Sequence, residues 1–72
     1  MVGARHMKIT LNGQEKILVS TVTVRELLQT LGMAEKRVAV EVNLEIVPRS
    51  RQGEVWLQNN DCVEVVVAIG GG

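Results

Sequence analysis

Alternating polar and apolar residues open the regular part of this chain. The alternation runs over residues 8–11 and ends at Asn12-Gly13. It predicts a strand with one buried face, and Asn-Gly is a strong signal for a two-residue hairpin turn because that turn needs positive φ angles. We therefore predict a hairpin whose return strand covers residues 15–20, with Ile17 and Val19 facing the core.

A helical spacing follows the hairpin. Thr23, with Glu26 three residues later, fits a capping box at the start of a helix. Gly32 provides the stop, since glycine adopts the left-handed conformation that ends many helices. Between them, apolar residues recur at i, i+3, i+4 and i+7, which is one stripe of a helix. The stripe consists of Val24, Leu27, Leu28 and Leu31.

The second half of the chain returns to alternation. Strands are predicted over residues 37–42 and 62–69, with a short strand at 46–47 that Pro48 ends because proline has no N–H donor. The stretch 49–60 between them is polar and irregular. The inward positions of the two long strands are Val38, Val40, Val42 and Val63, Val65, Val67. The order of elements predicts an α+β fold, in which one helix packs across a small mixed sheet and the last strand lies parallel to the first.

Composition and charge narrow the possible functions. The 72 residues form one small domain, and eight basic residues balance eight acidic ones. Nucleic acids and anionic membranes need a concentrated positive field, so neither is an expected partner. No apolar run approaches the ~20 residues of a membrane span. The single cysteine allows no internal disulfide, which fits a reducing cytoplasm.

Few side chains offer chemistry of their own. We assign residues 1–6 to a leader outside the fold, which removes His6 from catalytic or metal arguments. Cys62 is expected to be partly exposed without a chemical role, and Asp61 to be a turn residue, since no cluster of ligand types surrounds it. Trp56, the only aromatic residue, is interpreted as a satellite of the core. The expectation is that the chain needs no metal or cofactor.

The glycine end is the most informative stretch. The last strand leads directly into Gly70, Gly71 and Gly72. Because glycine has no side chain, three glycines form a narrow segment, and this segment loses much conformational entropy when it becomes ordered. We predict a folded domain over residues 7–69 and a flexible glycine tail over residues 70–72, able to enter a narrow active site and present the carboxylate of Gly72 there.

Several runs resemble the ThiS family, the sulfur carriers of thiamine biosynthesis. They are residues 37–43 (RVAVEVN), 45–50 (EIVPRS), 63–66 (VEVV) and the closing 68–72 (AIGGG). The resemblance implies a ubiquitin-like β-grasp fold and a free monomer. The chain departs from the family pattern at Leu44 and Asn60, where glycine is common, and in having its aromatic residue at Trp56 rather than near Gln52.

The resemblance also implies a mechanism in which this protein is a cosubstrate and not an enzyme. An E1-like enzyme would adenylate Gly72, a sulfur-relay or desulfurase enzyme would supply sulfur, and the resulting thiocarboxylate would pass it to thiazole synthase. Gly70 and Gly71 would thread into the partner. Exposed apolar residues near the tail, Val66, Ala68 and Ile69, are the candidate contacts.

Two other functional classes stay open at this point. One is the sulfur carrier of molybdopterin synthesis, which shares the diglycine end but approaches it through a proline-containing segment, where this chain has residues 67–69 (VAI). The other is a ubiquitin-like modifier joined to target lysines, or an interaction domain with an inert tail.

Overall fold

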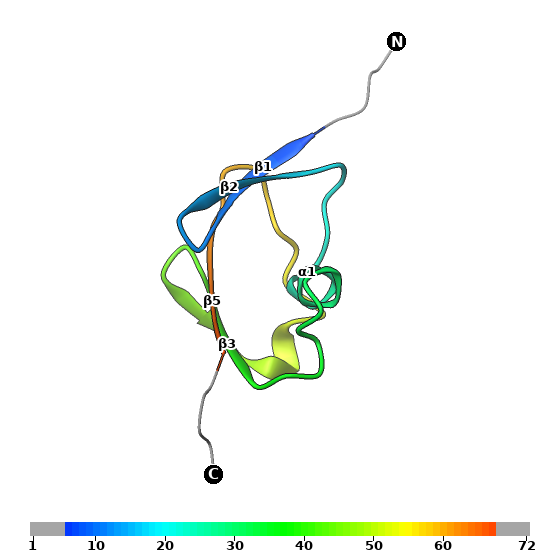
Figure 1. The fold of residues 1–72 in the computed structure, drawn as a ribbon, viewed down its shortest axis with the longest axis vertical. Helices are drawn as coiled ribbons and strands as arrows, with labels where there is room; N and C mark the ends of the chain where they lie inside the picture. Colours follow the sequence, from blue (N-terminus) through cyan, green and yellow to red (C-terminus); the bar gives the residue numbers. More distant parts are fainter. Residues whose placement is uncertain (1–5, 68–72) are drawn as a thin grey trace.

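The computed structural model describes residues 6–67, which form a five-stranded mixed sheet with one helix on one of its faces (Figure 1). The strands lie in the order β2-β1-β5-β3-β4, with β1 parallel to β5 and the other neighbours antiparallel. The elements are β1 (Met7–Leu11), β2 (Gln14–Leu18), α1 (Val24–Thr30), β3 (Val38–Val42), β4 (Glu45–Val47), the 3-10 helix η1 (Arg49–Arg51) and β5 (Cys62–Val67). The α+β arrangement and the parallel pairing of the first and last strands are as predicted.

The terminal predictions fall outside this range. Residues 1–5 of the predicted leader and residues 68–72, which include Ala68, Ile69 and the glycine tail, lie outside the described residues. No helix in the described part of the chain is long and apolar enough to cross a lipid bilayer.

Helix α1 begins with the predicted capping box. The Glu26 amide donates to Thr23 Oγ1 at 3.1 Å, and the Thr23 amide donates to Glu26 Oε1 at 2.9 Å. Gly32 follows the helix with φ +74°. A seven-residue helix is marginal by itself, so burial of its apolar stripe against the sheet must supply most of its stability.

The core is aliphatic and joins the helix to the inner face of the sheet. Val24, Leu27 and Leu28 of the stripe are buried, and Leu31 is half-buried. The sheet and the loop after η1 supply the remaining buried apolar residues, which are Ile9, Val40, Val47, Leu57, Val63 and Val65. Val38, Val42 and the other half-buried apolar residues pack around this cluster.

The irregular segment between η1 and β5 is tied to the start of the helix. Val24 N donates to Val55 O at 3.0 Å, and Leu57 N donates to Val22 O at 2.9 Å. Leu57 therefore points into the core, while its neighbour Trp56 is 55% exposed. The interpretation of Trp56 as a core satellite is wrong, because Leu57 occupies the buried position in this extended segment.

The prediction that Ile17 and Val19 face the core is also wrong, since they are 55% and 75% exposed. The two-residue turn pairs Lys8 with Ile17 and Ile9 with Lys16. Directly opposed residues project from the same face of a sheet. Ile9 is buried under the helix, so Ile17 emerges on the opposite face, and β2 ends before Val19.

The β3–β4 turn adopts positive φ angles at both central residues. Asn43 has φ +53° and Leu44 has φ +72°. These values suit a two-residue hairpin turn. Leu44 thus takes a left-handed conformation that glycine adopts more readily, with its side chain in solvent.

Candidate functional site

The candidate site is the end of β5, because this strand leads to the C-terminal residues. Within the sheet β5 is central, with β1 on one side and β3 on the other. Its pairing with β3 continues to Val67, the last described residue, whereas its register with β1 ends where Leu11 meets Val63. The strand therefore extends beyond the end of β1 toward the tail.

Asn12 supports β5 where β1 ends. Asn12 N donates to Val63 O at 2.9 Å, and the side chain then takes over, with Val65 N donating to Asn12 Oδ1 at 2.7 Å and Asn12 Nδ2 donating to Val65 O at 3.2 Å. A side-chain amide thus replaces the next peptide of the ladder. It holds β5 as far as Val65 although β1 has already turned.

A second asparagine holds the start of β5. Asn43 N donates to Cys62 O at 2.7 Å, and Cys62 N donates to Asn43 Oδ1 at 2.9 Å. The Asp61 carboxylate accepts from Asn43 Nδ2 at 2.9 Å and from Gln58 N at 2.7 Å. Asp61 is therefore a turn residue, as predicted, and hairpin-turn asparagines hold β5 at its start and in its middle.

We call the face of the sheet opposite α1 the open face (Figure 1). Near the end of β5 its side chains are exposed. Val66 is 61% exposed and lies opposite Ala39 of β3. Ile46 of β4 is also exposed and lies opposite Glu41. Glu41 in turn lies directly opposite Glu64 of β5. We call these five residues, Ala39, Glu41, Ile46, Glu64 and Val66, the docking patch.

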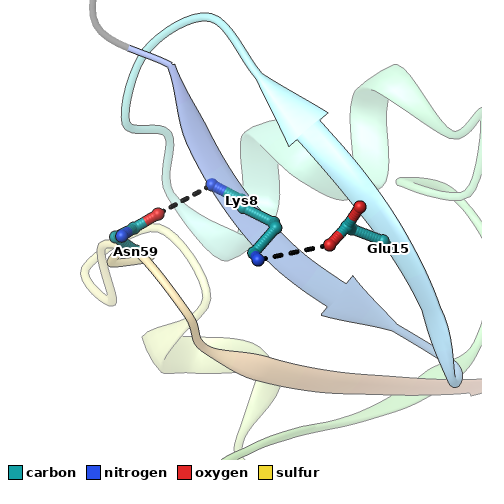
Figure 2. A network of polar contacts seen from close by, with 3 residues as sticks. All are labelled: Lys8, Glu15 and Asn59. Carbon is teal, nitrogen blue, oxygen red and sulfur yellow. Dashed lines mark hydrogen bonds and ion pairs between the residues drawn. The ribbon is translucent and has the colours of Figure 1, made fainter.

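At the hairpin end of the open face, the charged side chain of Lys8 is paired with a neighbouring carboxylate. Figure 2 shows Lys8 joined both to its neighbouring strand and to the loop before β5. Its Nζ lies 3.3 Å from Glu15 Oε2, and its backbone amide donates to Asn59 Oδ1 at 2.8 Å. Lys8 is thereby engaged with Glu15.

The side chains that could hold a metal ion do not gather in one place in the described part of the chain. Within residues 6–67 no group of three or more histidine, cysteine, aspartate or glutamate side chains is placed to hold a metal ion. His6 and Cys62 are both exposed. The described part of β5 carries exposed side chains at Cys62, Glu64, Val66 and Val67.

Comparison with known proteins identifies the family. The family model for ThiS matches residues 9–72. The sulfur carrier protein ThiS of Bacillus subtilis is 38% identical over 65 residues, covering 89% of this chain and 98% of that protein. The chain belongs to the ThiS family.

Solved structures and longer relatives agree with that assignment. The crystal structure of the thiamine biosynthesis protein ThiS from Geobacter metallireducens superposes with a TM-score of 0.79 at 32% identity, covering 92% of this chain and all of that one. This ThiS-family chain therefore has the β-grasp fold. It also matches a thiazole synthase of Paramagnetospirillum magneticum, 46% identical over 66 residues, which cover 92% of this chain but only 20% of that protein. The chain thus spans about a fifth of the length of this relative.

Sequence reasoning found part of this site. It placed Val66 on the exposed face of the last strand, and the structure agrees. Ala68, Ile69 and the three terminal glycines lie outside the described residues. The docking patch as a unit was missed, because alternation shows that Glu41 and Glu64 each face outward but gives no register between β3 and β5.

Proposed function

We propose that Gly72 is the sulfur-carrying residue of this ThiS-family chain. Its carboxylate attacks the α-phosphorus of ATP in an E1-like enzyme, forming an acyl-adenylate and releasing pyrophosphate. A persulfide then displaces AMP to give an acyl disulfide. A thiol cleaves the S–S bond, is itself oxidised to a disulfide, and leaves the terminal thiocarboxylate, which donates its sulfur to thiazole synthase.

One observation carries this proposal. The ThiS family match continues through the last strand to the glycines and includes residue 72. A carboxylate is a poor acceptor for a sulfur nucleophile, and adenylation supplies the leaving group that the exchange requires. Gly70 and Gly71 present no Cβ, so this segment fits a narrow entry to the nucleotide.

The partners supply the catalytic groups in this scheme. An E1-like enzyme adenylates the tail, a sulfur-relay or desulfurase enzyme provides the persulfide, and thiazole synthase accepts the sulfur. Val66, Ala68 and Ile69 contact these partners as the tail enters. The free chain acts as a monomer in the cytoplasm, where ATP and reduced thiols are available.

The test isolates the terminal carboxylate. Incubation with the adenylating enzyme, ATP, a persulfide source and a thiol should add the mass difference between sulfur and oxygen, mapped to Gly72. Deleting Gly71 and Gly72 shortens the tail by about 7 Å at full extension, so that variant should gain no mass while its denaturation midpoint stays unchanged. Adding one residue after Gly72 should also block the reaction, since catalysis tolerates little displacement of the reacting atom. A mass shift on Cys62, or one that survives the deletion, would refute the proposal.

A further inference from the structure

Two carboxylates of the docking patch face each other across neighbouring strands. Glu41 of β3 and Glu64 of β5 are direct partners in the antiparallel register. Their Cβ atoms are therefore about 5 Å apart on the same face, a spacing at which like charges are destabilising. The like-charge pair therefore lowers the stability of the free protein.

Within the described residues neither carboxylate is neutralised by an ion pair. The ion pairs found among residues 6–67 are Lys8–Glu15 and Arg51–Glu54. Lys8 belongs to the hairpin end of the open face, and Lys16 projects from the helix side of the sheet, since it pairs with the buried Ile9. The negative charge of the glutamate pair is therefore available to a partner.

The surroundings of the pair are those of an interface. Val66 and Ala39 lie opposite each other two residues further along the same strands, and Ile46 lies across from Glu41 on β4. Val66 and Ile46 are largely exposed. Exposed apolar side chains supply affinity when a partner buries them, and charges beside them set the register of the contact. This surface also lies on the strand that leads to Gly72.

We propose that the docking patch binds the adenylating enzyme through an arginine or lysine that enters between Glu41 and Glu64. The inference rests on the function proposed above and adds the chemistry of the contact. An enzyme that brings the anionic carboxylate of Gly72 to the anionic phosphates of ATP must surround them with positive potential. A negative patch on β5, the strand that precedes the tail in the sequence, and on its neighbour β3 is complementary to that field and increases the rate of productive encounter.

The experiment removes the charges and keeps the shape. The Glu41→Gln/Glu64→Gln variant should raise the KM of the adenylating enzyme for this protein about tenfold, measured by pyrophosphate release, with kcat unchanged at saturation. Its association rate should also depend less on ionic strength than that of the original chain. Its denaturation midpoint should be equal or higher, because a like-charge pair has been removed. Binding to the enzyme thus weakens while the stability of the variant does not fall. If the two glutamates had only a structural role, binding would weaken through a loss of stability.

A matched control changes the same net charge elsewhere. The Glu35→Gln/Glu45→Gln variant neutralises two exposed carboxylates away from the open face, since Glu45 pairs with the inward-facing Val42, and it should keep the original KM. The proposal is overturned if both variants raise KM equally, if neither does, if the patch variant has a lower midpoint, or if it loses binding to thiazole synthase and not to the adenylating enzyme. Failure of the original chain to be adenylated at all would instead refute the function proposed for Gly72.

Discussion

Within residues 6–67, four residues other than glycine adopt positive φ, and they show what single positions contribute to this fold. Three are asparagines, Asn12, Asn43 and Asn60, a residue type that tolerates the left-handed region. The fourth is Leu44, with φ +72° and a side chain that is 88% exposed. A left-handed leucine costs about 1–2 kcal/mol, and so exposed a side chain regains little of this by packing.

Replacing Leu44 with glycine should therefore stabilise the protein. We expect the free energy of unfolding to rise by about 0.5–1 kcal/mol, since the relief of strain exceeds the entropy that glycine adds to the unfolded chain. Chemical denaturation measures the change. Leu44→Ala is the control, because it keeps the Cβ and should leave stability close to the original. Equal effects of the two substitutions would contradict strain at this turn.

The positions of individual side chains were only partly predictable from the sequence. Alternation correctly placed Val40, Val63 and Val65 in the core. It failed at Ile17 because apolar character alone does not determine register. Counting outward from the Asn12-Gly13 turn pairs Ile9 with Lys16, and that count places a lysine on the helix side of the sheet and an isoleucine in solvent.

Among the elements, β5 depends most on side chains from outside its own strand. Asn12 accepts from and donates to the Val65 peptide, and Asn43 together with Asp61 fixes the start of the strand. No periodicity in the sequence shows these contacts, because they join residues at least eighteen positions apart in the chain. The stretch 49–60 was predicted only as polar and irregular for a similar reason, since its order comes from backbone bonds to the start of α1.

The support that Asn12 gives to β5 can be measured by a substitution that keeps the turn. Asn12→Gly retains the positive φ but removes both side-chain hydrogen bonds, so it should lower the free energy of unfolding by about 1–3 kcal/mol. Asn60→Gly is the matched control, because φ of Asn60 is also positive, at +73°. The hydrogen bond found for Asn60 is made by its backbone amide, which donates to Lys8 O at 2.6 Å. This substitution should shift stability by less than about 0.5 kcal/mol. Equal losses in chemical denaturation would show that the side chain of Asn12 adds nothing.

At the scale of the whole molecule, exposed apolar side chains occur on more than one surface. Val66 and Ile46 belong to the docking patch, Ile17 lies at the hairpin end of the open face, and Trp56 lies in the loop beside the helix. The fold class was predictable because helical and alternating spacings are each unambiguous over their own segments. The sequence did not predict which of these exposed surfaces binds a partner, because the exposure of a side chain depends on how the strands assemble into the sheet.

A polar substitution at Val66 should separate binding from folding. Val66→Thr keeps the β-branched shape, so the denaturation midpoint should change little, whereas the buried hydroxyl should weaken binding to the adenylating enzyme about tenfold. Ile17→Thr, on the same face but at the hairpin end, should leave the dissociation constant unchanged. Isothermal titration of both variants decides the matter, and identical affinities would remove Val66 from the interface.

The central position of β5 also has a mechanical consequence. A force applied along the strand toward the C-terminus loads its hydrogen bonds to β1 and β3 in shear, since those bonds lie roughly across the pulling direction. The bonds must then break together and not one at a time, as they would if an edge strand were peeled away. A partner protein that pulls on this end of the chain therefore loads the sheet in the direction in which it resists force most strongly. Such a partner can draw the carboxylate into its active site without unfolding the domain.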